Sequence, residues 1–151
     1  REASTFLQKL SAMYRYILQS RDKETVTLQH ELTFVQHYTD LQKSRFEDAL
    51  HIDIDIPGDY LLRHIVPVTL QNLFENAIKH NIVDDDAPLT IRVFVDGDSL
   101  VVENNLQLRA FVETSNRQGM ESLRTLYGYL SDTPLTVGSE GDRFVVRIPL
   151  L

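Results

Sequence analysis

The stretch NLFENAIKH at residues 72–80 carries polar side chains whose types and spacing could do chemistry. They are Asn72, Glu75, Asn76, Lys79 and His80. An asparagine amide offers a neutral oxygen to a hard cation such as Mg²⁺, while phosphate groups supply the negative charge. A lysine can meet phosphate oxygens, and a glutamate can orient a nucleophile or accept a proton. These residue types therefore indicate the handling of a metal-bound phosphate.

A helix is the element that would position these groups together. At about 100° per residue, the polar side chains from Asn72 to Lys79 fall within a sector of about 100°. The opposite stripe is apolar and consists of Leu70, Leu73, Phe74, Ala77 and Ile78. A plain solvated helix surface would also give this pattern. However, each asparagine costs about 0.5 kcal/mol of helix propensity, and two on one face favour a function for the amides.

Two further helices are predicted before this one. Residues 4–19 have apolar residues at alternating spacings of four and three, which is typical of an amphipathic helix with a coiled-coil-like seam. Thr27 is a predicted N-cap for a second helix that ends near Phe46. The two helices are expected to form a hairpin or a continued stalk.

The remaining segments alternate between strand and helix patterns. Residues 51–57 alternate apolar and polar residues, and 89–104 contain two strand patterns joined at Asp96-Gly97-Asp98. Residues 119–130 have helical spacing, and two more strands around a glycine turn complete the chain. The element order predicts an α+β sandwich that follows a helical arm.

Composition limits the classes of function. The chain has 151 residues, a hydrophobic share of 42% and a formal net charge of −7. The hydrophobic share is sufficient for a folded core, and the acidic balance argues against nucleic-acid or anionic-membrane binding. There is no cysteine, which excludes disulfides and thiolate metal sites. The chain opens at Arg1 in mid-pattern, so we expect it to be a fragment of a longer protein.

The stretch LQNLFENAIKHN closely resembles the N-box of histidine-kinase ATP-binding domains in the GHKL superfamily, and more narrowly the autolysin-regulator (LytS-like) class of sensor kinases. The pattern of that class is Pro-x-x-Leu-Gln-x-Leu-x-Glu-Asn-Ala-x-Lys-His. The residues that match it in place are Pro67, Leu70, Gln71, Leu73, Glu75, Asn76, Ala77, Lys79 and His80. The segment VTLQHELTFVQHYTDLQKSRF at 26–46 also looks like this class.

This resemblance implies a histidine-kinase-type (Bergerat) α/β sandwich, with a mixed sheet layered on helices. It implies ATP and Mg²⁺ as cofactors, with Asn76 as the metal ligand and Lys79 as a phosphate contact. Glu75 and Asn76 would be the catalytic residues, and Asn72 and His80 would line the nucleotide site. Phosphoryl transfer depends mainly on positioning and charge neutralisation, which these residue types can supply.

Several family motifs are altered in this chain. Asn104 stands where the family has an adenine-binding Asp, and Leu106 stands where it has Gly. We expect Asn104 and Asn105 to contact the nucleotide, although a turn at the strand end would explain them equally well. Of the family Gly-x-Gly motif only Gly119 is present, with Arg117 in place of the first glycine.

The expected ATP lid is 105–118, where Arg109 and Arg117 could reach phosphates. The family phosphoacceptor motif Pro-His-Phe-Leu-Phe-Asn is missing from the chain. His30 does not replace it, because its context QHELTFV lacks the rest of the box.

The predicted organisation is a helical arm at 1–46, a remnant of the dimerisation helices, followed by an ATP-binding catalytic domain at 47–151. Such a domain would transfer the γ-phosphate of ATP to a histidine outside the fragment. The resemblance implies a response regulator as partner, a homodimeric parent protein, and a cytoplasmic domain of a parent anchored in the bacterial inner membrane. No membrane contact is expected for the fragment itself. The alternatives are a degenerate module that serves dimerisation and signal relay without ATP turnover, and a hydrolysing ATPase of the same superfamily.

Overall fold

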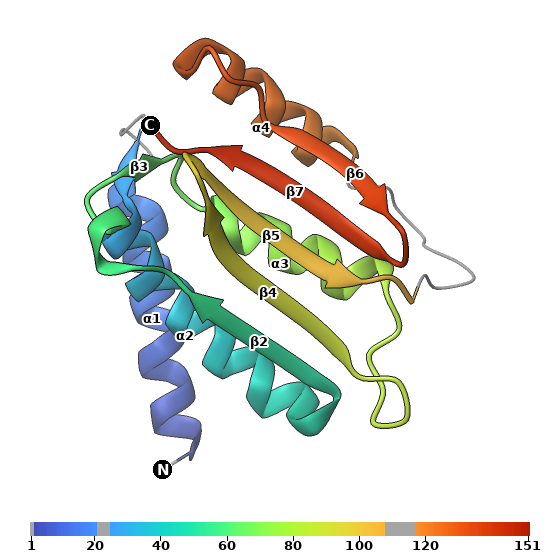
Figure 1. The fold of residues 1–151 in the computed structure, drawn as a ribbon. Helices are drawn as coiled ribbons and strands as arrows, with labels where there is room; N and C mark the ends of the chain where they lie inside the picture. The colour runs from blue at the N-terminus through green and yellow to red at the C-terminus, as the bar shows by residue number, and fades with distance from the viewer. Residues whose placement is uncertain (1, 21–24, 108–116) are drawn as a thin grey trace.

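The computed structural model describes residues 2–20, 25–107 and 117–151 (Figure 1). The helices are α1 (Glu2–Ser20), α2 (Leu28–Phe46), α3 (Thr69–His80) and α4 (Arg117–Leu130). The strands are β1 (Val26–Thr27), β2 (Leu50–Asp55), β3 (His64–Ile65), β4 (Leu89–Asp96), β5 (Ser99–Asn105), β6 (Thr136–Glu140) and β7 (Arg143–Pro149). Short 3₁₀ turns occupy Glu47–Ala49 and Gly58–Tyr60.

The main sheet has five strands in the order β2-β4-β5-β7-β6. β2 and β4 are parallel and are connected through α3, whereas the other neighbouring pairs are antiparallel. Gly97 and Gly141 have φ angles of 63° and 64° at the two hairpin turns, a conformation that glycine adopts without steric cost. The predicted mixed sheet and the hairpin at Asp96-Gly97-Asp98 are therefore confirmed.

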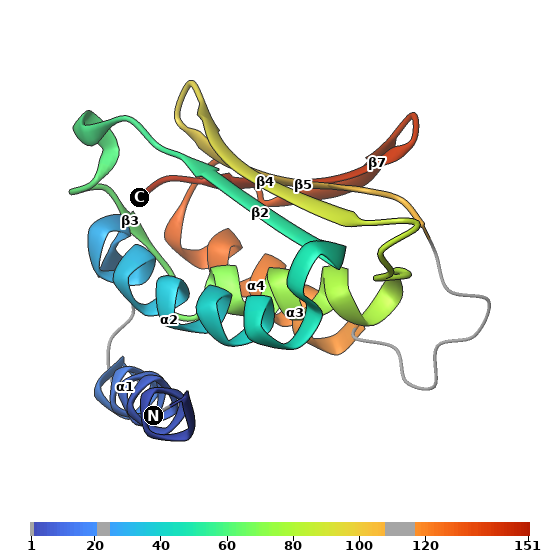
Figure 2. The same ribbon diagram turned by 90° about the horizontal axis from the view of Figure 1, so that it is seen from below.

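The molecule is layered. α2, α3 and α4 cover one face of the main sheet, and α1 lies beyond α2 on the side away from the sheet (Figure 2). The outward face of the sheet carries ion pairs, in which Glu103 binds Arg143 and also Arg92 at 2.9 Å. The helical layer contains α3, the helix with the N-box-like stretch, flanked by α2 and α4 (Figure 2).

The two N-terminal helices form a hairpin, one of the two arrangements expected. Lys9 Nζ of α1 lies 2.8 Å from Asp40 Oδ2 of α2, although the residues are 31 positions apart. α2 begins where the sequence predicted, because the Thr27 hydroxyl accepts a hydrogen bond from the His30 backbone N–H at 3.2 Å. The extended conformation of Thr27, with φ of −69° and ψ of 151°, is the usual one for an N-cap.

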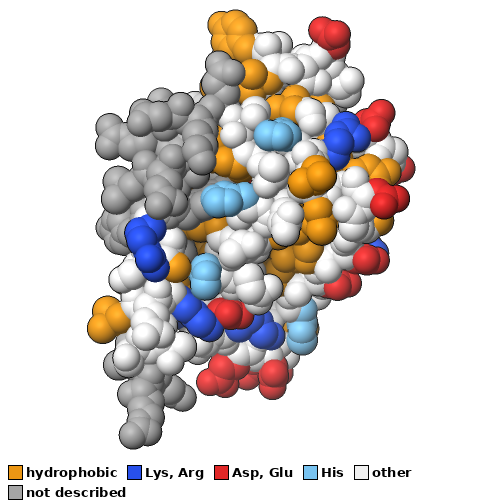
Figure 3. Space-filling model, turned by 90° about the vertical axis from the view of Figure 1, so that its left-hand side faces the viewer, with side chains coloured by type: hydrophobic (Ala, Val, Ile, Leu, Met, Phe, Trp, Pro, Cys, Tyr) orange, Lys and Arg blue, Asp and Glu red, His pale blue; other side chains and the backbone are white. Residues whose placement is uncertain are grey.

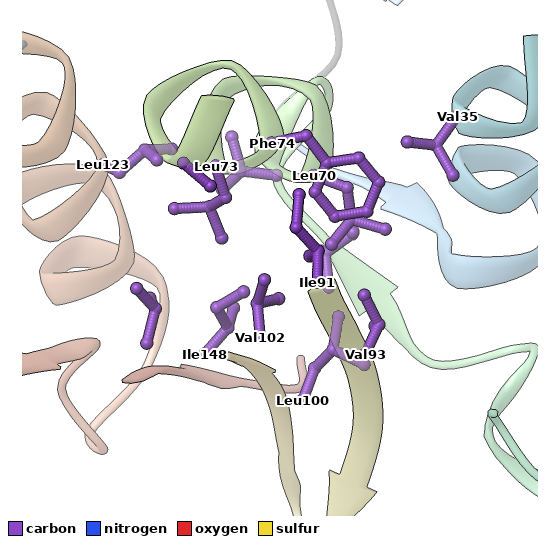
Figure 4. Packing of buried hydrophobic residues seen from close by; sticks show 14 of the residues in the cluster. Val35, Leu70, Leu73, Phe74, Ile91, Val93, Leu100, Val102, Leu123 and Ile148 are labelled. Carbon is purple, nitrogen blue, oxygen red and sulfur yellow. The ribbon is translucent and has the colours of Figure 1, made fainter. Parts of the chain in front are cut away.

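The core lies between the sheet and the helical layer. The apolar stripe of α3 is buried and points at β4, β5 and β7, with Leu123 of α4 on one side and Val35 of α2 on the other (Figure 4). Leu70 and Phe74 have no exposed surface. Burying these side chains is the main stabilising term for α3, since twelve-residue helices are marginal in isolation.

α2 belongs to this core, although we grouped it with the helical arm. Its inward side chains Leu28, Phe34, Val35 and Tyr38 lie in the same buried cluster as the α3 stripe. The packing shows no break at residue 46. The division into an arm at 1–46 and a catalytic domain at 47–151 stays a prediction about function.

Candidate functional site

The polar face of α3 is the candidate site, and the helix presents it as the wheel predicted. Asn72 and Glu75 are exposed, whereas Asn76, Lys79 and His80 are half-buried. The opposite stripe, from Leu70 to Ile78, is buried. The α3 polar face, defined as residues 72, 75, 76, 79 and 80, therefore gathers two amides, a carboxylate, an ammonium group and an imidazole beside solvent.

Glu75 occupies the side of this face that borders α2. Gln71 Nε2 donates to Glu75 Oε1 at 2.9 Å, which orients the carboxylate. Burial raises the pKa of the Tyr38 hydroxyl on α2 well above its usual range, the negative charge of Glu75 raises it further, and Arg45 opposes the shift. The charge of Glu75 on α3 therefore acts on the Tyr38 hydroxyl of α2.

The N-terminal end of α3 is held by a residue from another helix. The N-cap is Val68, which has a left-handed conformation with φ of 68° and no capping side chain. Glu31 of α2 supplies the cap instead, because its two carboxylate oxygens accept from Val68 N at 3.1 Å and from Leu70 N at 3.0 Å. Glu31 is completely buried.

This role of Glu31 is not among the predictions from the sequence. The signal was present, because Glu31 lies three residues after Leu28 and four before Val35, on the apolar face of α2. A carboxylate at such a position must find buried partners.

A buried hydroxyl of α4 completes the attachment of the α3 N-terminus. Tyr127 Oη accepts from Val66 N at 2.9 Å and lies 2.9 Å from Thr69 Oγ1, which donates to Val66 O at 2.6 Å. Burial raises the pKa of Tyr127 far above its usual range, although its hydrogen bonds to Thr69 and Val66 lower it, and the nearby Glu31 raises it further. Tyr127 is therefore held as a neutral hydroxyl, and α2, α3 and α4 meet at this point.

The C-terminal end of α3 is attached to the end of β5. Asn81 is 3% exposed, its Nδ2 donates to Ala77 O at 2.9 Å, and its Oδ1 accepts from Gln107 N at 2.8 Å. Ile82 N also donates to Gln107 O at 2.8 Å. The chain thus enters the expected lid segment directly beside the last turn of α3. The sequence offers one signal for this role, because an asparagine directly after a helical pattern is a common helix C-terminus.

The two asparagines at the end of β5 differ in their surroundings. Asn104 is 5% exposed and lies on the sheet face that packs against the helices. Its neighbours on the adjacent strands are Ile91 and Phe144, and its Nδ2 donates to Asn105 O. Asn105 has both ends of its amide bonded to backbone, with Oδ1 accepting from Thr90 N at 2.8 Å and Nδ2 donating to Pro88 O at 3.2 Å. These bonds account for Asn105 as a structural residue, and its predicted contact with a nucleotide stays a prediction.

Part of the predicted site lies outside the described residues. Most of the expected lid, including Arg109, falls in 108–116. Gly119 is in the first turn of α4, but the surroundings of Arg117 and Gly119 are also not described. The predicted roles of these residues stay predictions.

Other surface features lie apart from the α3 polar face. An open hollow of about 410 Å³ lies on α2 and the neighbouring loop, lined by Gln29, Leu32, Thr33, Gln36, His37 and Leu61. The side of the molecule where α1 lies has scattered histidines and a rim of acidic side chains (Figure 3). Within residues 2–20, 25–107 and 117–151, no group of three or more His, Asp or Glu side chains is placed to hold a metal ion. None of the helices in those ranges combines the length and apolar character needed to cross a bilayer.

Several known proteins with similar sequences are sensor histidine kinases. The histidine kinase family model matches residues 1–50. Over 159 aligned positions the chain is 32% identical to the sensor histidine kinase BtsS of Escherichia coli K12, covering 98% of this chain and 28% of BtsS. It is 33% identical over 125 residues to the sensor protein kinase HptS of Staphylococcus aureus, covering 83% of this chain and 22% of HptS. The chain therefore spans about a quarter of the length of these relatives.

Solved structures of histidine kinases are similar to this chain in fold. The cytoplasmic segment of the histidine kinase QseC matches with a TM-score of 0.58 at 15% identity, covering 99% of this chain and 93% of that chain. The catalytic domain of the histidine kinase ThkA matches with a TM-score of 0.54 at 13% identity, covering 83% and 93%. The chain is thus similar in sequence to the sensor histidine kinase BtsS along nearly its whole length, and its α+β fold is similar to that of the catalytic domain of ThkA.

Proposed function

We propose that this chain is the ATP-binding catalytic domain of a two-component sensor histidine kinase of the LytS-like class. The observation that carries the proposal is the α3 polar face. Its amides, carboxylate and lysine project beside solvent from a helix of a histidine-kinase fold, and the neighbouring elements hold that helix at both ends. The similarity to BtsS and HptS supports the proposal for the wider class of sensor kinases.

In this proposal, Asn76 is the protein ligand of a Mg²⁺ ion that arrives with the nucleotide phosphates. The donor set fits this ion, because Asn76 offers the neutral oxygen of a half-buried amide, and the phosphates supply negatively charged oxygens. Lys79 contacts the phosphates, and Asn72 and His80 contribute to the same nucleotide site. Asn104 and Asn105 at the end of β5 and Gly119 at the start of α4 complete the nucleotide contacts.

The reaction is transfer of the γ-phosphoryl group to a histidine outside this chain. The unprotonated ring nitrogen of the histidine attacks phosphorus, the bond to the bridging oxygen of ADP breaks, and the proton on the other ring nitrogen must be accepted. Glu75 is the acceptor we propose, because Gln71 holds its exposed carboxylate in place. Bound Mg²⁺ neutralises charge on the phosphates, and the protein contributes mainly by positioning.

The same proposal covers the setting of the domain. The parent protein is expected to be a homodimer anchored in the bacterial inner membrane, with this domain in the cytoplasm. Its phosphorylated histidine would pass the phosphoryl group to a response regulator.

The test is the variant Asn76→Ala, measured by calorimetric titration with ATP in the presence and absence of Mg²⁺. The side chain lies away from the buried stripe, so truncation leaves no core cavity, and the melting temperature without ligand should hold steady or rise slightly. We expect the Kd for Mg²⁺–ATP to rise at least tenfold, which removes about 1.4 kcal/mol of ligand-induced stabilisation.

The matched control is Ser44→Ala, which truncates an exposed polar residue of α2 and should leave the Kd unchanged. If Asn76→Ala binds Mg²⁺–ATP as tightly as the parent chain, the assignment of Asn76 is wrong. If the parent chain gives neither heat nor a thermal shift with saturating Mg²⁺–ATP, the proposal fails and the degenerate signalling module takes its place.

A further inference from the structure

Glu31 connects two helices that are distant in sequence. It lies in the first turn of α2, and its carboxylate oxygens reach backbone N–H groups 37 and 39 residues further along the chain, at Val68 and Leu70. The side chain is completely buried. Burying a carboxylate is costly unless hydrogen bonds satisfy it, so its retention here indicates that both oxygens are held by strong, charge-assisted bonds.

The position that Glu31 clamps is an unusual helix start. Val68 has a φ of 68°, in the left-handed region that β-branched residues rarely adopt. It also offers no side-chain oxygen to the free N–H groups of the first turn. Glu31 therefore satisfies these donors, places a negative charge at the positive end of the α3 dipole, and keeps Val68 in its strained conformation.

The clamp acts on the helix that carries the α3 polar face. Asn76 lies eight residues beyond Val68, or about 12 Å along the helix axis at about 1.5 Å per residue. A tilt of about 5° at the clamped end would therefore displace Asn76 by about 1 Å, and a misplacement of this size can cost about 10²-fold in rate. Hydrophobic burial of the α3 stripe is non-directional and does not by itself set this angle.

We propose that Glu31 is a positioning residue for the nucleotide site, fixing the orientation of α3, and with it Asn76 and Lys79, relative to α2. α2 is joined to α1 by the Lys9–Asp40 ion pair. Glu31 is then a polar contact through which a displacement of the α1–α2 hairpin reaches the α3 polar face. This inference rests on the proposed function of the α3 polar face.

The test is Glu31→Gln in the full chain. Glutamine has nearly the same size, but its NH₂ group would face one of the two backbone N–H donors that the carboxylate now accepts, so one contact is lost. We expect the variant to fold and to bind Mg²⁺–ATP at least tenfold more weakly. In the free protein, ¹H–¹⁵N spectra should show shifts of the Asn76 side-chain amide and of the α3 backbone amides.

A destabilised control separates positioning from loss of stability. Val145→Ala removes buried methyl groups on the sheet face that points away from the helices. With both variants assayed at least 20 °C below their melting temperatures, we expect Val145→Ala to keep its Kd within twofold of the parent and its α3 resonances unshifted. Glu140→Gln makes the same change from carboxylate to amide at an exposed end of β6, and it should leave the Kd unchanged.

A conservative variant provides a second measurement. Glu31→Asp keeps the carboxylate but is one methylene shorter, so we expect a Kd between those of the parent and Glu31→Gln. If Glu31→Gln does not fold, Glu31→Asp carries the test, and a parental Kd in that variant overturns the inference.

The outcomes distinguish the two proposals. If the parent chain binds Mg²⁺–ATP and Glu31→Gln binds it equally well, or if Val145→Ala weakens binding as much as Glu31→Gln, the positioning role is wrong and the proposed function stands. If the parent chain does not bind Mg²⁺–ATP, the proposed function fails and the positioning role fails with it.

Discussion

Removing the hydroxyl of Tyr127 should destabilise the protein well beyond the loss of one surface hydrogen bond. Tyr127 is completely buried, and its hydroxyl accepts from Val66 N and contacts Thr69 Oγ1, both at 2.9 Å. Because Thr69 donates to Val66 O, the Tyr127 hydroxyl is the donor to Thr69. In Tyr127→Phe the ring still fills its space, but the buried N–H of Val66 has no acceptor.

The magnitude follows from that single unsatisfied donor. A buried backbone donor without a partner costs about 1–3 kcal/mol. For a domain of about 150 residues, a loss of about 2 kcal/mol lowers the melting temperature by about 4–8 °C. Urea denaturation followed by circular dichroism should show this loss as a lower midpoint with an unchanged m-value.

The same helix offers a matched control. Tyr129, two residues further along α4, is 84% exposed, so Tyr129→Phe should change the free energy of unfolding by less than about 0.5 kcal/mol. A double-mutant cycle with Thr69→Val should be non-additive, because Thr69 and Tyr127 share one network. Equal losses in Tyr127→Phe and Tyr129→Phe would refute the reasoning, since burial of the hydroxyl would then make no difference.

The pH dependence of this variant provides a second readout. The pKa of Tyr127 is raised in the folded protein. The contribution of its hydroxyl to the free energy of unfolding is therefore fully present below the unfolded pKa of about 10, and it is lost as the pH rises toward the folded pKa. The stability deficit of Tyr127→Phe should therefore narrow above about pH 10.

Three further substitutions test α2 and its contact with α1. Thr27→Ala should lower the free energy of unfolding by about 1 kcal/mol in thermal melts, because the cap to His30 N is lost. Thr33→Ala should be neutral or slightly stabilising, since the hydroxyl of this exposed residue only bonds back to Gln29 O. Burial raises the pKa of Asp40, but its hydrogen bonds to Lys9 and Gln36 outweigh this and hold the pKa below its usual range. The parent should therefore be more stable than Asp40→Asn at pH 7, by less than about 1 kcal/mol. This difference should vanish as the pH falls through the folded pKa of Asp40. A difference that persists in strong acid would contradict this explanation.

The sequence by itself determined the elements and the composition of the α3 polar face. Local rules were sufficient here, because strand alternation at 51–57, the Asp96-Gly97-Asp98 turn and the Thr27 cap act over a few residues. The helical periodicity of residues 70–80 correctly predicted which side chains of α3 are buried and which form its polar face, because it determines which side chains share a side. The resemblance then predicted Asn76 as a metal ligand and Lys79 as a phosphate contact, which periodicity alone could not do.

Only the tertiary structure decided how that face is held. The capping of α3 by Glu31 and the bonds of Tyr127 to Val66 and Thr69 join residues from 37 to 61 positions apart. The partners of Glu31, and Val66 as a partner of Tyr127, contribute backbone N–H groups, which nearly every residue carries, so no pattern in the sequence identifies them. The place of α2 in the core, and the bond of Asn81 to Gln107 at the entry to the lid segment, likewise depend on which surfaces meet when the helices pack on the sheet. Such pairings are set by the global minimum of packing and hydrogen bonding, and a one-dimensional pattern does not contain them.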